Sequence, residues 1–167
     1  NLKTAFFASI SIFLYACVYT PLKQKTPLAV FVGAFPGAIP FMLGWVAATN
    51  EFGIEPGILF MLQFFWQFPH FWAIGWLMHD QYEAAGFKML PSGGRDQNTA
   101  FQIVFYTLWT VVISLIPAFQ YIGALSLTKT SSFLVFMLFA IFLYYAIKLI
   151  VVKTVHAARL SFRTIIV

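Results

Sequence analysis

Residues 57–78 read GILFMLQFFWQFPHFWAIGWLM. The stretch contains no charged residue, and its apolar residues do not alternate with polar ones as they would in a half-buried strand. A helix that crosses a bilayer needs about 20 mostly apolar residues. The stretch is therefore predicted to be a transmembrane helix, and it indicates the class of fold to expect in the rest of the chain.

Four further windows have the same character, at residues 4–20, 28–48, 100–121 and 131–152. Their only full charge is Lys148, near the end of a window. None shows the strict alternation of a transmembrane barrel strand, so helices are favoured. The expected fold is all-α, a polytopic transmembrane helix bundle forming a single domain over residues 1–167. Residues 161–167 read as the start of another span and the first residue is not Met, so we expect a fragment of a longer protein.

The composition supports a membrane protein and excludes several other classes. Hydrophobic residues make up 61% of the chain, aromatic residues 20% and charged residues 9%. Soluble domains carry about 25% charged residues, and disordered chains are poor in aromatic residues. The single cysteine, Cys17, excludes a disulfide framework and a cysteine-based metal site.

The basic residues predict which side of the membrane each loop faces. The loops at 21–27, 79–99 and 153–163 carry most of them, whereas the other side has Lys3 and Lys129. Basic residues concentrate on cytoplasmic loops, so the three loops are predicted to be cytoplasmic. The basic residues of these loops are Lys23, Lys25, Lys88, Arg95, Lys153, Arg159 and Arg163. They are too dispersed to indicate nucleic-acid binding.

One face of the 57–78 span is polar. Gln63, Gln67 and His70 recur at helical spacing and therefore share a face. Polar groups within a bilayer are costly and usually face a bundle interior or a wet cavity. Two interpretations remain open: hydrogen bonds between helices, which need no ligand, or an aromatic-lined ligand cavity, in which His70 could ligate a heme iron.

The loop at 79–99 combines acidic and basic residues. Asp80 and Glu83 are three residues apart, so they share a face if the helix continues, and they could then hold one hard cation. Mg²⁺ typically takes one or two carboxylates and fills its shell with water and substrate phosphates. Lys88 and Arg95 could contact a phosphate or a carboxylate. The alternative is a solvated loop whose charges only balance one another.

The loop at 21–27 presents Lys23 and Lys25 beside Tyr19 and two threonines. Such residues can form an anion site, or they can serve as anchors at the membrane surface. Together the two loops place cations and carboxylates at the end of an aromatic-rich bundle. A diphosphate with a long apolar tail would suit this arrangement.

These residues resemble a known family. The run YTPLKQKT at 19–26 resembles a segment of the protoheme IX farnesyltransferases, in the UbiA superfamily of intramembrane prenyltransferases. Residues 36–45 look like the helix that follows it in that family. His70-Phe71-Trp72 followed by DQYEAAGFKMLP at 80–91 resembles its second acidic motif, and residues 158–162 fit the approach to its last helix.

The resemblance implies both an architecture and a reaction. The five spans would be helices four to eight of a nine-helix bundle. The implied enzyme, in a bacterial inner membrane, transfers the farnesyl group of farnesyl diphosphate to a vinyl group of heme b, after which water adds a hydroxyl to give heme O. Mg²⁺ would be the cofactor, with heme b as a substrate. A heme A synthase or a terminal-oxidase assembly is the expected protein partner.

The resemblance also implies roles for particular residues. Asp80 and Glu83 would hold Mg²⁺ and, with Lys23, would be catalytic. The residues expected to bind substrate are Tyr19 and Lys25 at the diphosphate, His70 and Gln67 near the heme, and Lys88 and Arg95 at the diphosphate or the heme propionates.

The chain departs from the family pattern in two ways. The first acidic motif of the family lies before Asn1, and the second motif has Gln81 and Ala84 where relatives have acidic residues. The 167-residue chain alone is therefore predicted to be inactive. Two alternatives are a prenyltransferase of the superfamily with a quinone-ring or chlorin acceptor, and a membrane subunit that binds heme without catalysis.

Overall fold

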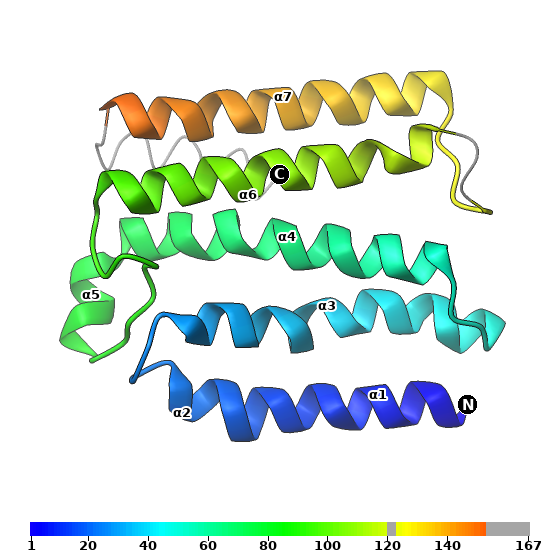
Figure 1. The fold of residues 1–167 in the computed structure, drawn as a ribbon, viewed down its shortest axis with the longest axis horizontal. Helices are drawn as coiled ribbons and strands as arrows, with labels where there is room; N and C mark the ends of the chain where they lie inside the picture. Colours follow the sequence, from blue (N-terminus) through cyan, green and yellow to red (C-terminus); the bar gives the residue numbers. More distant parts are fainter. Residues whose placement is uncertain (120–122, 153–167) are drawn as a thin grey trace.

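The computed structural model describes residues 1–119 and 123–152. Five long helices lie side by side in chain order, and each runs antiparallel to the next (Figure 1). They are α1 (Leu2–Phe13), α3 (Leu28–Thr49), α4 (Ile54–Leu77), α6 (Gln97–Leu115) and α7 (Lys129–Val152). Shorter elements extend or connect them: a π-helical segment η1 (Leu14–Tyr19), α2 (Thr20–Leu22), α5 (His79–Ala84) and a 3₁₀ turn η2 (Ile116–Ala118). The predicted all-α bundle is confirmed.

Within the described residues, four helical segments are long and apolar enough to cross a membrane, namely Leu2–Leu22, Leu28–Thr49, Gln97–Ala118 and Lys129–Val151. They correspond, with shifted ends, to four of the five predicted spans. The fifth, α4, is not among them. The crossing of the membrane by α4 therefore stays a prediction. In the row of helices α4 lies between α3 and α6, which are both candidate spans (Figure 1).

The ends of the helices follow local chemistry. Asn50 closes α3 in the left-handed conformation, with φ of 58°, a position that Asn tolerates better than most residues. The predicted 100–121 span overlaps the candidate span Gln97–Ala118. Within it α6 ends at Leu115, and Pro117, which has no N–H to donate, lies in the 3₁₀ turn that follows. Residues 120–122 and the predicted loop at 153–163 lie outside the described residues.

Small side chains on α3 allow it to approach α4 closely. Ala34 and Ala38 are fully buried in the same cluster as Phe64 and Phe68 of α4. Helices in membranes associate through such small residues, because lipid supplies no hydrophobic force that would drive them together. The core therefore lies along α3, α4 and α6.

The N-terminus of α6 is closed by its own side chains. Asp96 accepts hydrogen bonds at Oδ1 from the Ser92 hydroxyl at 2.6 Å and from the Thr99 backbone N–H at 2.8 Å. These bonds stabilise the carboxylate and hold the pKa of Asp96 below its usual range, the Ser92 bond having the larger effect. Asp96 thus fixes the point at which the loop after α5 turns back into the bundle.

Candidate functional site

The two loops that were predicted to form one polar end do lie together. The Lys88 backbone N–H donates a hydrogen bond to the Lys23 carbonyl at 3.0 Å. The Lys23 ammonium lies 4.9 Å from the centre of the Phe87 ring, a cation–π contact. Lys23 is half-buried, whereas Lys25, two residues later in the same turn, is exposed. The structure therefore brings Lys23, rather than Lys25, against the 79–99 loop.

A cavity of about 250 Å³ lies within the 79–99 loop and beside Pro27. Glu83 and Lys88 supply opposite charges to its lining, and Tyr82 and His79 supply further polar groups. Lys88 and Glu83 are exposed, so charged ligands can approach them from water. This polar cavity is at the end of the bundle where α4 gives way to α5.

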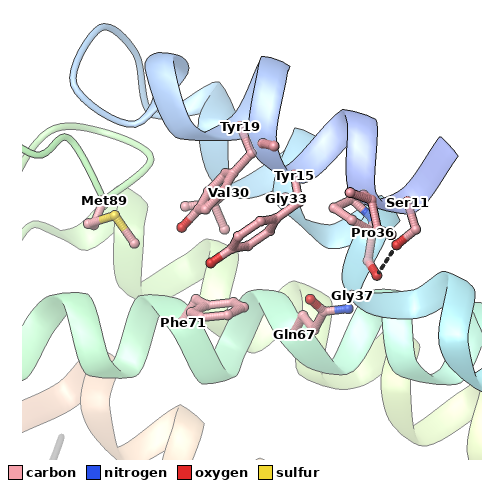
Figure 2. Close-up of a pocket in the computed structure, with 12 residues that line it drawn as sticks. Ser11, Tyr15, Tyr19, Val30, Gly33, Pro36, Gly37, Gln67, Phe71 and Met89 are labelled. Carbon is pink, nitrogen blue, oxygen red and sulfur yellow. Dashed lines mark hydrogen bonds between the residues drawn. The ribbon is translucent and has the colours of Figure 1, made fainter. Parts of the chain in front are cut away.

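A larger cavity of about 460 Å³ lies between α1–η1, α3 and α4, and its lining is mostly apolar. Figure 2 shows the rings of Tyr15 and Tyr19 reaching from η1 toward Phe71 on α4. Met89 lines both this cavity and the polar one. An apolar cavity and a polar cavity thus meet at one residue, at the end of the bundle that carries Lys23.

Two glycines on α3 make room for the residues that line the apolar cavity. A Cβ on Gly33 would lie 2.7 Å from Cδ2 of Tyr19, and a Cβ on Gly37 would meet the Gln67 amide. Any larger residue would therefore push the Tyr19 ring or the Gln67 amide out of place. The positions of the Tyr19 ring and the Gln67 amide therefore depend on the absence of a side chain at Gly33 and Gly37.

The π-helical segment η1 sets the direction of Tyr15 and Tyr19, whose ring centres are 5.4 Å apart. A proline within a helix clashes with the carbonyl four residues earlier, which for Pro21 is that of Cys17. A wider turn relieves this clash, and η1 is the turn directly before Pro21. π-Helical turns are rare and occur frequently at functional sites.

Prolines in α3 also join that helix to α1. Pro40 has no N–H, so the carbonyl of Pro36 lacks its usual partner within the helix. The Ser11 hydroxyl of α1 donates to this carbonyl at 3.0 Å, as the dashed line in Figure 2 shows. This bond fixes α1 against α3 at the edge of the apolar cavity.

Gln67 is the most buried polar side chain of the apolar cavity, with 4% of its surface exposed. Its amide nitrogen donates to the Ala34 carbonyl at 3.2 Å. One of the two interpretations of the polar face, a hydrogen bond between helices, therefore holds for the Gln67 nitrogen. The oxygen of the same amide remains on the cavity side (Figure 2).

His70 is half-buried, and its ring stacks on Trp66, with the ring centres 4.5 Å apart. Phe71, the next residue, lines the apolar cavity. His70 thus lies next to a residue of the cavity wall. Its predicted contact with a heme stays a prediction.

Asp80 and Glu83 both lie on the short helix α5, and each has a partner within the protein. The Arg95 guanidinium contacts Asp80 at 3.2 and 3.3 Å, and His79 lies 3.9 Å from Glu83. Among the described residues no group of three or more His, Cys, Asp or Glu side chains could hold a metal. Two exposed carboxylates fit a Mg²⁺ that takes most of its ligands from water and phosphate, and they do not form a closed metal centre.

Arg95 was predicted to contact substrate, but its guanidinium is engaged by the protein. Its Nε donates to the Trp76 carbonyl at 2.7 Å, and a terminal nitrogen lies 3.5 Å from the Leu77 carbonyl. The last carbonyls of a helix have no partner within the helix. Arg95 supplies partners for those of α4 and at the same time holds Asp80 on α5.

Comparison with known proteins identifies the family. The family model described as "UbiA prenyltransferase family" matches residues 1–166. The chain belongs to the UbiA prenyltransferase family. No solved structure matches it.

Several relatives within this family are highly similar. Proteins named "Protoheme IX farnesyltransferase" from Christiangramia forsetii and Flavobacterium psychrophilum are 64% and 63% identical to the chain over 159 residues. One of the same name from Flavobacterium johnsoniae is 58% identical. Each alignment covers 95% of this chain and 53% of the relative. The chain thus spans about half the length of the curated relatives it matches.

Sequence reasoning missed several residues that shape the site in this UbiA family chain. Gly33, Gly37 and Tyr15 line the apolar cavity, and Phe87 contacts Lys23. The spacing of Gly33 and Gly37, one helical turn apart on an apolar helix, signals a close approach to a neighbour. For Tyr15 the signal was weaker: it lies one helical turn before Tyr19, so the two side chains are expected on the same face.

Proposed function

We propose that the whole protein to which this chain corresponds is a membrane enzyme that makes heme O from heme b and farnesyl diphosphate. The observation that carries the proposal is the junction at Met89, where a charged cavity opens beside a mostly apolar one. Farnesyl diphosphate has the same two parts, a charged head and an apolar tail. The head lies in the loop cavity and the tail lies between α1, α3 and α4.

The basic residues of the loops bind the diphosphate. Lys88 lines the polar cavity, and Lys23 is linked to the same loop through its carbonyl and its contact with Phe87. As the bond between carbon 1 of the farnesyl group and the diphosphate oxygen breaks, negative charge grows on the leaving group, and nearby cations stabilise it. Asp80 and Glu83 are proposed to hold Mg²⁺, which when bound supplies further positive charge to the diphosphate.

The apolar cavity protects the reactive carbon from water. Departure of the diphosphate leaves an allylic cation, which the vinyl group of the heme attacks. Tyr15, Tyr19 and Phe71 present aromatic rings to the cavity. Aromatic rings stabilise a cation through their π faces, and the mostly apolar lining limits the access of bulk water, which would hydrolyse the cation early.

The names of the relatives support heme as the acceptor. All three of the proteins described above are called protoheme IX farnesyltransferases. The motif around Met89 and Leu90 resembles that of the heme branch, and both side chains are buried beside the cavities. A quinone-ring or chlorin acceptor has no comparable support.

The membrane and the protein partners are also part of the proposal. Flavobacterium relatives favour the inner membrane of a bacterium, and the basic residues favour a cytoplasmic location of the 21–27 and 79–99 loops. The product would pass to a heme A synthase or to a terminal oxidase during its assembly.

The test uses the full-length protein in membranes. Heme b, farnesyl diphosphate and Mg²⁺ are added, and heme O is sought by chromatography and mass. The proposal predicts heme O from the wild-type protein and about a hundredfold less from Lys23→Ala, since loss of one charged contact to the leaving group costs about 2–3 kcal/mol. Prenylated 4-hydroxybenzoate without heme O, or no prenylated product of either kind, would overturn the proposal.

A further inference from the structure

The Gln67 amide oxygen faces the apolar cavity, and the transfer of the farnesyl group does not explain its role. Only 4% of the surface of Gln67 is exposed, and its amide nitrogen donates a hydrogen bond to the Ala34 carbonyl. Because a carbonyl can only accept, this bond assigns the NH₂ group to Ala34 and leaves the amide oxygen facing the cavity (Figure 2). This oxygen is open to the cavity, where it can accept a hydrogen bond from a donor.

The other polar side chains that line the cavity are Ser11, Tyr15 and Tyr19. Ser11 already donates to the Pro36 carbonyl. The hydroxyl groups of Tyr15 and Tyr19 also line the cavity, and in the described part of the chain no hydrogen bond engages either of them. An ordered water needs two to four polar partners. The Gln67 oxygen as acceptor and a tyrosine hydroxyl as donor supply two within a mostly apolar space.

We propose that the Gln67 amide oxygen binds and orients the water that adds a hydroxyl to the farnesylated heme. This inference rests on the proposed function, which requires such a water after the new carbon–carbon bond has formed. Gln67 then acts as a positioning residue for the second step, and it has no role in the departure of the diphosphate.

The electron pair of the vinyl double bond forms the bond to carbon 1 of the farnesyl group, and the vinyl carbon next to the porphyrin ring becomes cationic. A lone pair of the water forms a carbon–oxygen bond to this carbon. One water proton then leaves to the released diphosphate, a stronger base than an amide oxygen. The products are the alcohol and protonated diphosphate, with no oxidant or reductant needed.

Without an oriented water the same cation has a second outcome. It can lose a proton from the neighbouring carbon and form an alkene, which is lighter than the alcohol by the mass of one water. The ratio of alkene to alcohol therefore reports the position of the water. A general loss of fold or of substrate binding would lower both products together and leave this ratio unchanged.

The test compares Gln67→Leu with a matched control, Gln63→Leu, in the full-length protein. Gln63 lies one turn earlier on the same helix and does not belong to the apolar cavity. We expect Gln67→Leu to raise the ratio of alkene to alcohol about tenfold, the effect of losing one hydrogen bond of about 1.4 kcal/mol. Gln63→Leu should leave it unchanged. Gln67→Glu, a neutral acid in apolar surroundings that keeps one donor and one acceptor, should restore the alcohol.

The outcomes separate this inference from the proposed function. An unchanged ratio in Gln67→Leu overturns the inference while heme O formation by the wild-type protein still supports the function. If Gln67→Leu does not accumulate in the membrane, Gly37→Ala gives the same test, because its methyl group would displace the Gln67 amide. An unchanged ratio there also overturns the inference. Absence of any farnesylated heme from the wild-type protein overturns both.

Discussion

At the scale of single residues, Gly33 gives a sharp test of the apolar cavity. In Gly33→Ala the new Cβ would lie 2.7 Å from Cδ2 of Tyr19, so the ring must move within the cavity. We expect the KM for farnesyl diphosphate to rise about tenfold, equivalent to 1.4 kcal/mol, because Tyr19 would occupy space that the farnesyl group needs. Steady-state kinetics of the full-length enzyme measure this.

Gly44→Ala is the matched control, since Gly44 lies on the same helix and a Cβ there would have no neighbour within 4 Å. It should leave the KM unchanged, and replacing a helical Gly with Ala should stabilise the protein slightly. Equal KM values for Gly33→Ala and the wild type would show that the farnesyl group lies elsewhere.

Asp96 allows a second residue-scale prediction, about stability and pH. Asp96→Ala removes the N-cap of α6 and should lower the free energy of unfolding by about 1 kcal/mol. Because the pKa of Asp96 is lowered in the folded state, its stabilisation is present above the ordinary carboxyl pKa and is lost as the pH falls through the folded value. Thermal unfolding in detergent at several pH values measures both effects.

Asp96→Asn separates the cap from the charge. Asn still accepts at the N-cap position, so it should retain most of the stability and lose the dependence on acidic pH. If Asp96→Ala and Asp96→Asn were equally destabilised at neutral pH, the cap would not be the source of the stabilisation.

At the scale of elements, Arg95 connects the end of α4 to α5. Arg95→Ala would leave the Trp76 and Leu77 carbonyls without this donor and should cost about 1–3 kcal/mol of stability. Asp80→Ala should cost less than about 1 kcal/mol, because Asp80 is 79% exposed and its pair with Arg95 is screened by water. Thermal unfolding of both variants measures the difference.

Substitutions at the same two positions should differ in the opposite sense in activity. Asp80→Ala should abolish farnesyl transfer if Asp80 holds Mg²⁺, while Arg95→Lys should retain a measurable rate. An Asp80→Ala protein that is fully active but as unstable as Arg95→Ala would assign Asp80 a purely structural role.

The helices themselves were largely predictable, since long apolar runs without charge allow little else in a membrane. Their ends were less so: α4 begins at Ile54 rather than residue 57, and α6 ends at Leu115. The π-helical segment η1 was not predicted, although Pro21 carries the steric reason for it. Hydropathy reports the environment of a segment and contains no information on such local turn geometry.

The roles of site residues were harder to predict than the helices. The sequence correctly predicted that the 21–27 and 79–99 loops meet, because their charges indicated a common side. The sequence could not indicate that the Arg95 guanidinium donates hydrogen bonds to carbonyls of α4, because a sequence does not show which partners a guanidinium has. Likewise, a glutamine within a span indicates a polar contact but not which of its two amide atoms makes it.

At the scale of the whole molecule, the account depends on where the farnesyl tail lies. The structure has another apolar groove of about 520 Å³ between α4 and α6, lined by Met61, Phe65 and Trp109 among others. Its lining on α4 lies between Ile54 and Phe65, in the first half of that helix, whereas the 79–99 loop follows the end of α4 at Leu77. It offers no charged side chain for a diphosphate, so we assign the tail to the cavity at Gly33 and Phe71.

The most direct measurement is photolabelling of the full-length protein with a farnesyl diphosphate analogue that carries a diazirine within its farnesyl chain. The account predicts that peptides containing Ile12, Gly37 or Phe71 are labelled and that excess farnesyl diphosphate prevents the labelling. Labelling confined to peptides with Met61 or Trp109, or labelling that excess farnesyl diphosphate does not reduce, would contradict it.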